Sequence, residues 1–389
     1  MTRLRRICIV TGSRAEYGVL QPLIRAIADD PELTLQLIAT GSHLVPEFGL
    51  TYRSIEADGF SIDRKIEMQL SSDTALGMAK SVGLGVLGFA DALDALAPDV
   101  VVIMGDRFEM LAVAQAAFLT GIAIAHISGG EVTEGAIDDS IRHAISKLAR
   151  YHFVAAEPYR HRVIQLGEQP SSVFNVGDPA LDNIALLPLL DRDALCRATG
   201  LDPRRPYLLV TYHPVTLGND DPVQGMEALI AALDGRADHG VLITMPNADA
   251  GGRRLAAMVA GFAARHPDRV VAATSLGQLT YLSAMKHCAA VVGNSSSGII
   301  EAPALRRPTV NIGPRQDGRL KADSIIDCAA DAAAIAKALQ VATSPEFQAA
   351  LAGVHSLYGA CNASAQIHGL LKRLDLTRNR VKRFHDVAF

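Results

Sequence analysis

The stretch that could do most chemistry follows the apolar run Ile122–Ile127 and is rich in acids and histidines. It reads Ala125-His-Ile-Ser-Gly-Gly-Glu131 and continues as Thr133-Glu-Gly-Ala-Ile-Asp-Asp-Ser-Ile-Arg-His143. The polar side chains singled out in it are those of His126, Glu131, Asp138, Asp139 and His143. They come directly after a strand-like segment, at the kind of strand end where open α/β sheets place their chemistry.

The preceding apolar run ends in the same way, because Val100–Met104 is followed by Gly105 and Asp106. Acids on two adjacent strand ends could face one cleft and move protons there. The alternative is that these acids only cap helices, a role for which Asp138 is well placed. A helix cap needs only one acid, so capping alone does not explain four acids in these two segments, namely Asp106, Glu131, Asp138 and Asp139.

The composition describes a compact protein with two domains of ordinary size. The chain has 389 residues, of which 49% are hydrophobic and 20% charged, and it has only 18 prolines. A net charge of −4 gives no reason to expect nucleic acid as a partner. The basic C-terminal tail from Lys372 to Arg383 is interpreted as a solvated surface.

The five cysteines are widely spaced and form no Cys-x-x-Cys pair, which favours a reducing, cytoplasmic compartment and argues against a disulfide framework or a zinc site. The N-terminus lacks the apolar core of a signal peptide. Met110–Gly130 has no charged residue and approaches the length of a membrane span. Thr120-Gly121 interrupts it, so we interpret it as a helix followed by a buried strand and expect no membrane partner.

Strand-length apolar runs alternate with amphipathic stretches almost throughout, which predicts parallel βαβ units. In the first half the predicted strands are 6–11, 34–40, 99–105, 122–127, 151–155 and 173–176. The predicted helices between them are 19–28, 74–96, 109–119, 137–149 and 158–166.

A second series of predicted strands covers 207–212, 240–245, 270–273, 289–292 and 309–312. The segment 179–206 has no strand pattern and is interpreted as the connection between domains. We therefore expect two Rossmann-like domains, 1–178 and 179–364, with residues 365–389 packing back on the first. The cleft between such domains is the default ligand site.

The second half carries a candidate phosphate site at Val291-Val-Gly-Asn-Ser-Ser-Ser-Gly-Ile-Ile-Glu301. Helix N-terminal amides with the hydroxyls of Ser295, Ser296 and Ser297 beside them could cradle phosphates, and Gly298 keeps the site open. Glu301 could accept hydrogen bonds from ribose hydroxyls. The alternative is that the serines only cap the helix.

Cationic candidates follow other strands. Arg14 lies in a glycine-bounded loop after the first strand, and Arg315 and Arg319 follow the last one. A guanidinium suits a two-pronged phosphate contact, although surface arginine is the alternative for each. His213 ends the first strand of the second half and is either a site residue or a capped structural one.

In this order the motifs resemble the hydrolysing UDP-N-acetylglucosamine 2-epimerases of bacterial sialic and legionaminic acid pathways, which share a two-domain, glycosyltransferase-B-like fold. The matching segments are Gly12–Gly18, Thr40–Leu44, Gly105–Glu109, Gly129–Val132, Ile137–Ala144, Tyr212–Pro214, Asn294–Gly298 and Arg315. The non-hydrolysing relatives match less well, because they use a different loop at Gly41–Leu44 and lack the Gly-Gly-Glu-Val string.

The resemblance implies a metal-independent reaction without cofactor, in which C2 is deprotonated, the nucleoside diphosphate leaves and water adds to a glycal. The implied catalytic residues are Asp106, Glu131, Asp138 and His213. The implied substrate-binding residues are Arg14, His43, Ser128, Arg142, Asn247, Ser295, Ser296, Ser297, Gly298, Glu301 and Arg315. A homodimer or homotetramer is also expected.

One position departs from the family pattern. Animal-type members have glutamate two residues after His126, whereas this chain has Ser128, which cannot exchange protons at neutral pH. Either Glu131 or a neighbour replaces that group, or the sugar is a diacetamido-trideoxy sugar of the bacillosamine type. Other functions to weigh are a non-hydrolysing epimerase, a glycosyltransferase and a non-catalytic sensor.

Overall fold

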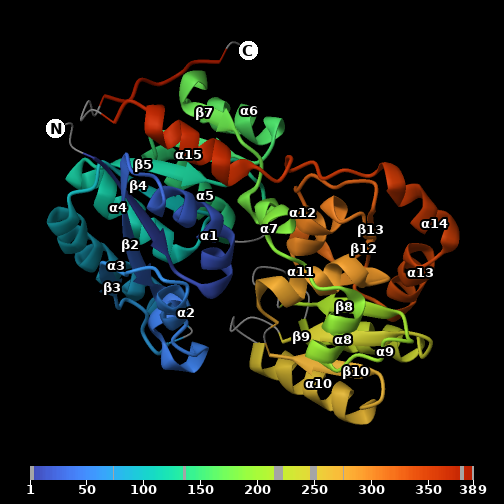
Figure 1. Cartoon of the computed structure of the whole chain (residues 1–389). Coiled ribbons are helices and arrows are strands. Elements are labelled where there is room, and N and C mark those ends of the chain that lie inside the picture. The colour runs from blue at the N-terminus through green and yellow to red at the C-terminus, as the bar shows by residue number, and fades with distance from the viewer. Residues whose placement is uncertain are drawn as a thin grey trace. The chain divides into compact units, whose positions relative to one another are not determined.

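The computed structural model describes residues 4–72, 74–134, 137–213, 222–245, 252–274, 276–376 and 381–387 (Figure 1). The chain divides into two compact units. Unit 1 comprises Met1–Glu131, Ile137–Asp182 and Tyr358–Phe389, and unit 2 comprises Val132–Ala136 and Asn183–Leu357. The sequence placed the crossings after residues 178 and 364, whereas the structure has them after Asp182 and Leu357.

Unit 1 is built on a seven-stranded parallel sheet with the order β3-β2-β1-β4-β5-β6-β7. Its strands are β1 (Arg5–Thr11), β2 (Leu33–Thr40), β3 (Arg64–Ile66), β4 (Val100–Met104), β5 (Ala123–Ile127), β6 (Tyr151–Val154) and β7 (Val173–Asn175). The order reverses between β1 and β4, so this is a doubly wound sheet whose loops at the carboxyl edge are the expected ligand site.

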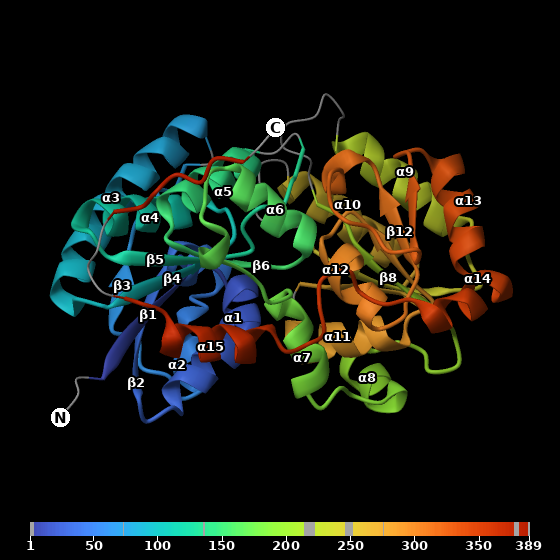
Figure 2. The ribbon, with the colours of Figure 1, turned by 90° about the horizontal axis from the view of Figure 1, so that it is seen from above.

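Helices cover both faces of this sheet because its side chains alternate between two apolar cores (Figures 1 and 2). Ile7 and Ile9 face the layer of α1 and α15, and Cys8 and Val10 face the layer of α3, α4 and α5. The α-helices of unit 1 are α1 (Arg14–Ala28), α2 (Tyr52–Ala57), α3 (Ala75–Leu96), α4 (Phe108–Thr120), α5 (Ile137–Leu148), α6 (Glu157–Gln165) and α15 (Ala363–Arg373). Helix α7 (Asp182–Leu186) begins at the last residue of unit 1 before the crossing and otherwise belongs to unit 2. Short 3-10 turns lie at Gly41–Leu44, Pro46–Phe48, Pro170–Ser172 and Pro179–Leu181.

Unit 2 repeats the plan with a six-stranded parallel sheet of order β10-β9-β8-β11-β12-β13. Its strands are β8 (Tyr207–Thr211), β9 (Gly240–Thr244), β10 (Val270–Ala273), β11 (Ala290–Gly293), β12 (Thr309–Ile312) and β13 (Ile325–Cys328). Its α-helices are α8 (Arg192–Thr199), α9 (Pro222–Asp234), α10 (Gly252–Arg265), α11 (Gly277–His287), α12 (Ser297–Ala304), α13 (Ala332–Ala342) and α14 (Pro345–Ala350), and its 3-10 turns lie at Pro314–Gln316 and Leu351–Gly353.

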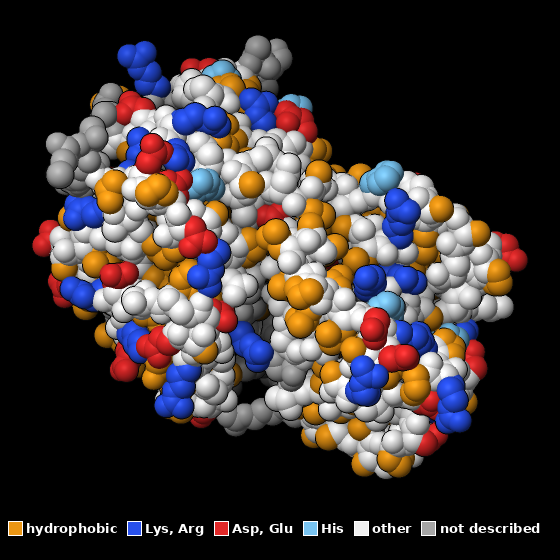
Figure 3. Space-filling model, viewed as in Figure 1, with side chains coloured by type: hydrophobic (Ala, Val, Ile, Leu, Met, Phe, Trp, Pro, Cys, Tyr) orange, Lys and Arg blue, Asp and Glu red, His pale blue; other side chains and the backbone are white. Residues whose placement is uncertain are grey.

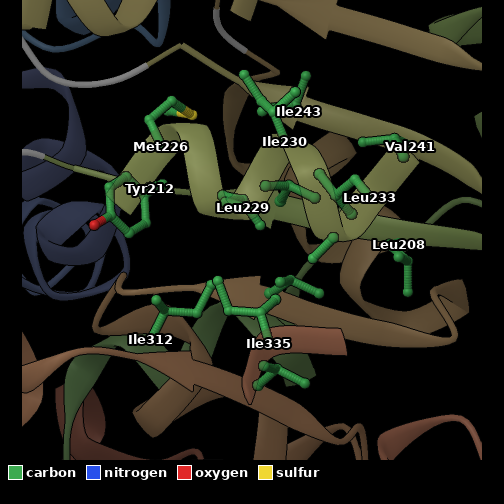
Figure 4. Close-up of a cluster of buried hydrophobic side chains, with 14 of the residues drawn as sticks. Leu208, Tyr212, Met226, Leu229, Ile230, Leu233, Val241, Ile243, Ile312 and Ile335 are labelled. Carbon is green, nitrogen blue, oxygen red and sulfur yellow. The ribbon is translucent and has the colours of Figure 1, made fainter. Parts of the chain in front are cut away.

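The core of unit 2 shows why these segments fold together. Leu208 of β8 and Ile243 of β9 pack against Leu229 and Leu233 of α9, with Ile335 of α13 completing the cluster (Figure 4). The prediction of two parallel-sheet α/β domains is confirmed.

The structure corrects three details of the predicted elements. Helix α1 begins at Arg14 and not near residue 19, because the Ser13 hydroxyl caps it by accepting the Glu16 N–H at 3.3 Å. Two edge strands, β3 and β13, were missed. They are only three and four residues long, and both carry charged side chains, as edge strands often do.

Charged groups of both signs are interspersed over the face of the molecule seen in Figure 3. Within the described ranges, one helix is long and apolar enough to cross a membrane by length and composition alone. This helix is α3, and 33% of its apolar window is buried in the protein. A single such helix is weak evidence, because the core helix of a soluble protein passes the same test.

Candidate active site

The predicted acids gather at the carboxyl edge of the unit 1 sheet, where β4 and β5 end side by side. Met104 pairs with Ile127, and the Gly105 N–H donates to the Ile127 carbonyl at 3.0 Å. The segments that follow β4 and β5 then turn through left-handed backbone conformations, at Gly105 (φ 77°) and Ser128 (φ 63°). A serine in this region costs about 1–2 kcal/mol relative to glycine, which marks this turn as one held by its surroundings.

Asp106 and Arg142 form the central ion pair of this edge. The Arg142 guanidinium is 2% exposed and contacts the Asp106 carboxylate, whose side chain is 23% exposed. The same guanidinium donates to the Glu131 carbonyl at 2.9 Å and lies 3.5 Å from the Asp139 carboxylate. Arg142 therefore ties the β4 and β5 loops to the first turn of α5 and leaves part of Asp106 open to solvent.

Asp138 lies in the first turn of α5, beside this pair. Burial, and next the charge of Asp106, raise the pKa of the Asp138 carboxyl above its usual value. The helix N-terminus opposes this shift, because it stabilises negative charge. Two carboxyl groups in different environments are the arrangement that acid–base chemistry requires.

His126, on β5, is fully buried next to this edge of the sheet. Its Nε2 lies 2.7 Å from the Gly105 carbonyl, which can only accept, so Nε2 carries the proton. Nδ1 then accepts from the Ser146 hydroxyl at 3.1 Å. Burial lowers the pKa of His126 to about 3, so the ring is neutral and fixes the Gly105 turn that presents Asp106.

Other predicted residues of unit 1 lie at the ends of β1 and β2. Arg14 is exposed and is the first residue of α1, not part of a loop as predicted. His43 is fully buried, and its two ring nitrogens lie 3.1 Å from the Thr11 hydroxyl and 2.8 Å from the Thr51 hydroxyl. Burial lowers the pKa of His43 to about 4, so it acts as a neutral brace for these loops.

A buried carboxyl that the sequence did not single out lies behind Gly12. Glu16 is 7% exposed, and its Oε2 accepts the Gly12 N–H at 3.2 Å. Burial and the charge of Glu109 raise the pKa of Glu16 to about 8, although the Gly12 N–H opposes the shift. Glu109 is fully buried and bound by Arg107 through two contacts at 3.1 and 3.2 Å. The Ser13-x-x-Glu16 capping spacing was the signal that could have revealed it.

Unit 2 presents the candidate phosphate site at the N-terminus of α12. Ser295 and Ser297 share a hydrogen bond at 3.0 Å, and Ser296 lies partly exposed between them. Gly298 allows α12 to pack closely on β12, because a Cβ there would lie 2.8 Å from a Thr309 methyl. The helix amides thus stand beside hydroxyl groups, as a phosphate cradle requires.

Tyr281 was missed by sequence reasoning, because no motif surrounds it. Its hydroxyl lies 2.6 Å from the Ser297 hydroxyl and 3.3 Å from that of Thr211. Burial raises the pKa of Tyr281 to about 12, so it keeps its proton and can orient the serine.

Asn294 holds the predicted His213 and Arg315 together. Its side-chain carbonyl accepts the His213 N–H at 2.7 Å, and its amide donates to the His213 carbonyl at 2.9 Å. Its backbone carbonyl accepts from Arg315 and from Gln316, both at 2.9 Å. Burial and the charge of Arg315 lower the pKa of His213 to about 3, so His213 is neutral.

The remaining predicted residues are Glu301 and Asn247. Glu301 is 9% exposed and lies one turn into α12. The prediction for Asn247 lies outside the described residues. The roles assigned to all the site residues stay predictions.

Comparison with known proteins agrees with this architecture. Residues 25–372 match the family model described as UDP-N-acetylglucosamine 2-epimerase. The chain is 43% identical to the hydrolysing GDP/UDP-N,N'-diacetylbacillosamine 2-epimerase of Campylobacter jejuni, over 83% of this chain and 84% of that protein. It is 35% identical to the hydrolysing UDP-N,N'-diacetylbacillosamine 2-epimerase of Legionella pneumophila, over 96% and 97% of the two chains.

A solved structure shows the same fold. The UDP-GlcNAc 2-epimerase of Neisseria meningitidis, bound to UDP-GlcNAc, superposes with a TM-score of 0.80 at 16% identity, covering 95% of this chain and 100% of that one. At this identity the likeness concerns the fold alone. The family model and the two relatives confirm the resemblance read from the motifs, and they confirm the expectation that the protein is an enzyme. The chain belongs to the UDP-N-acetylglucosamine 2-epimerase family.

Proposed function

We propose that this protein is a hydrolysing 2-epimerase that converts a UDP- or GDP-linked acetamido sugar and water to the free 2-epimer and the nucleoside diphosphate. The observation that carries the proposal is the pair of unlike carboxyl groups, Asp106 and Asp138, at one sheet edge. Asp106 is paired with the buried Arg142 guanidinium, whereas burial and the charge of Asp106 raise the pKa of the Asp138 carboxyl, which makes Asp138 the better candidate to carry a proton.

The proposed reaction requires proton transfers at C2 of the sugar, for which the carboxyl groups of unit 1 are the candidates. One carboxylate removes the weakly acidic C2 proton while the C1–O bond breaks, so that the electron pair of C2–H forms the glycal double bond. Water then adds its oxygen to C1, and C2 receives a proton from the opposite face. In this proposal Asp106 and Asp138 are the two proton-transfer groups, and Glu131, which is 3% exposed at the same edge, takes the part that Ser128 cannot.

The departing diphosphate needs positive charge or N–H groups. We propose that the α12 N-terminus with Ser295, Ser296 and Ser297 binds it, together with Arg315, and that Glu301 holds the ribose. His213 is neutral, so it would act as a hydrogen-bonding group and not as a cation. Arg14 and Asn247 are further candidates from the motifs for substrate contact.

We place the diacetamido sugar of the bacillosamine type ahead of N-acetylglucosamine. The printed names of the two relatives at 43% and 35% identity both specify diacetylbacillosamine, and Ser128 departs from the animal-type pattern. UDP-N-acetylglucosamine is the second candidate, since the family description names it. We further propose a cytoplasmic homo-oligomer whose product enters nonulosonic acid synthesis.

The test offers UDP- and GDP-linked diacetylbacillosamine and N-acetylglucosamine separately, without an acceptor, and identifies the products by NMR. Free 2-epimer and nucleoside diphosphate in equal amounts are expected from one diacetamido substrate. Epimerised nucleotide sugar would instead show a non-hydrolysing enzyme, and no turnover without an acceptor would favour a glycosyltransferase. Asp138→Asn is the inactive variant, with exposed Asp29→Asn as the matched control that retains the rate.

A further inference from the structure

The C-terminal strap, residues 381–387, lies beside α5, the helix whose first turn carries the predicted acids (Figure 2). The sequence predicted a solvated basic surface for this tail. In the structure the Lys382 ammonium instead donates to the Lys147 carbonyl at 2.7 Å and to the Ala149 carbonyl at 2.6 Å. Its third contact is the Glu168 carboxylate, at 2.7 Å. An ammonium has three N–H donors, so all three are used within unit 1.

These contacts close the C-terminal end of α5. The last carbonyl groups of an α-helix have no partner within the helix, and they carry a partial negative charge. Lys147 belongs to the last turn of α5, and Ala149 follows directly after the helix. Lys382 supplies this end with both hydrogen-bond donors and a positive charge, although it lies 235 positions further along the chain than Lys147. The strap therefore holds the end of α5 in place.

The strap is itself held by the loop that follows α6. The His385 N–H donates to the Gly167 carbonyl at 2.9 Å, and the Gln169 side-chain amide donates to the Arg383 carbonyl at 3.3 Å. The Phe384 ring lies directly on Gly167, where a Cβ would be 2.2 Å from a ring carbon. Gly167 has a φ of 89°, so glycine is needed both for the turn and for the close approach of the ring. The strap thus has a surface of unit 1 shaped to receive it.

Glu168 makes the contact with the strap a buried one, because this carboxylate is only 1% exposed. It also accepts from the Lys147 ammonium at 2.9 Å and lies 3.1 Å from Nε2 of His152. Burial opposes ionisation, but hydrogen bonds from the imidazole and from the two lysines lower the pKa of Glu168 to about 2. Glu168 is therefore charged at neutral pH, and Lys382 is one of the two lysines that neutralise it.

Helix α5 connects this end to the candidate active site. In its last turn the Ser146 hydroxyl donates to Nδ1 of His126 at 3.1 Å, and Nε2 of His126 donates to the Gly105 carbonyl at 2.7 Å. In its second turn Arg142 contacts the Asp106 carboxylate. Rigid secondary elements and hydrogen-bond networks of this kind carry coupling between distant sites. A change in the seat of the last turn is therefore transmitted to the residues around Asp106.

We propose that Lys382 is a positioning residue for the proposed reaction: it seats α5 at the depth where Asp138 stands beside Asp106. This inference rests on the proposed function, because it takes Asp138 as a proton-transfer group. Without the ammonium, two carbonyl groups and a buried carboxylate lose a partner, and the end of α5 shifts.

Such a shift acts on the rate of the chemical step. Misplacing a reacting group by about 1 Å can cost about a hundredfold in rate. The strap contacts named above include no residue proposed to bind the nucleotide, so the loss falls on kcat and not on KM.

The test compares variants of the full chain by steady-state kinetics with the nucleotide sugar that the wild type turns over. Lys382→Met should lower kcat about tenfold and change KM by less than about twofold. Lys382→Arg keeps a charged donor and should recover kcat to within about threefold of the wild type. The matched control is Lys372→Met, which removes another lysine from the C-terminal region, paired at 2.8 Å with Asp30, a carboxylate of unit 1 that is 8% exposed. It should keep kcat within about twofold of the wild type.

Melting curves establish that each variant is folded at the assay temperature, and hydrogen exchange detected by mass spectrometry follows α5. The amides of α5 should exchange faster in Lys382→Met than in the wild type, and at the wild-type rate in Lys372→Met. Unchanged kcat in Lys382→Met, an equal loss of kcat in Lys372→Met, no recovery in Lys382→Arg, or unchanged exchange of α5 would each overturn the proposal. A wild type without turnover would instead refute the proposed function, and the exchange of α5 would still decide whether Lys382 seats this helix.

Discussion

Replacing Asp106 and Asp138 separately by asparagine should produce the same loss of activity but different losses of stability. Asp106 neutralises Arg142, whose side chain is 2% exposed, so Asp106→Asn leaves a buried guanidinium without its main counter-charge. Removing one partner of a fully buried pair costs about 3–5 kcal/mol. Asp106 is 23% exposed, and Asp139 and the Glu131 carbonyl still contact Arg142, so we expect about 2 kcal/mol.

Asp138 differs because its folded-state pKa is raised. The stability that a raised carboxyl contributes is fully present below its unfolded pKa and is lost as the pH rises through the folded pKa. The folded state therefore disfavours the charged form of Asp138, and Asp138→Asn, which removes that charge, should change stability at neutral pH by less than about 0.5 kcal/mol, or increase it.

Both variants should lose at least about a hundredfold in turnover, the scale of general acid–base catalysis. Asp106→Asn should also shift the acidic limb of the remaining rate to lower pH, because burial would still raise the pKa of Asp138 but the added effect of the Asp106 charge would be gone. The assays are release of nucleoside diphosphate across a pH series and denaturant unfolding of each variant. Near-wild-type turnover in a folded Asp138→Asn variant would remove Asp138 from proton transfer, and equal destabilisation by both changes would show that Asp106 does not stabilise the buried Arg142.

Three other predictions concern groups around the site. The free energy of unfolding of Glu16→Gln, measured with denaturant at several pH values, should fall less with rising pH than that of the wild type. The reason is that the raised pKa of Glu16 gives the wild type a stabilising contribution that is full below pH 4.5 and lost above about pH 8. A wild-type decline that persists in the variant would contradict this assignment. Lys382→Met should lower the free energy of unfolding by about 1–2 kcal/mol, because it removes a cation that lies 2.7 Å from Glu168, a carboxylate that is only 1% exposed. The loss should be no larger, since Lys147 and His152 still contact Glu168 in the variant. No change in the denaturation midpoint would show that the C-terminal segment adds no stability there. Asn294→Ala removes both side-chain hydrogen bonds to His213 and should raise the KM for the nucleotide sugar. The increase should be about tenfold larger than that in the control variant Asn175→Ala, which changes an exposed asparagine. Equal KM values of the two variants in steady-state assays would remove Asn294 from the nucleotide site.

Much of the fold was predictable from the sequence, because most central strands are apolar runs, and several are followed directly by glycine, as at Gly12, Gly105 and Gly313. Val270–Ala273 and Thr309–Ile312 were predicted with their observed bounds. The missed strands, Arg64–Ile66 and Ile325–Cys328, lie at sheet edges, where one-sided pairing allows short and charged sequences.

The site was predictable as a set of motifs but not as a set of contacts. The sequence indicated both Asp106 and Arg142, yet their pairing depends on how α5 packs beside β4 and β5. It did not indicate that His43 and Arg142 are buried and bonded within unit 1, which makes both of them braces for neighbouring loops. Tyr281 contacts Ser297 only through the packing of α11, a relation between distant segments that no local pattern encodes.

In the proposed reaction a carboxylate of unit 1 exchanges hydrogen at C2 of the sugar while the nucleoside diphosphate departs. Turnover of the unlabelled diacetamido substrate in D₂O, followed by NMR and mass spectrometry, tests it directly. Every free 2-epimer molecule should carry one solvent deuteron at C2. Product that retains its original C2 hydrogen would show that no protein group exchanges hydrogen there, whatever the rate of its formation.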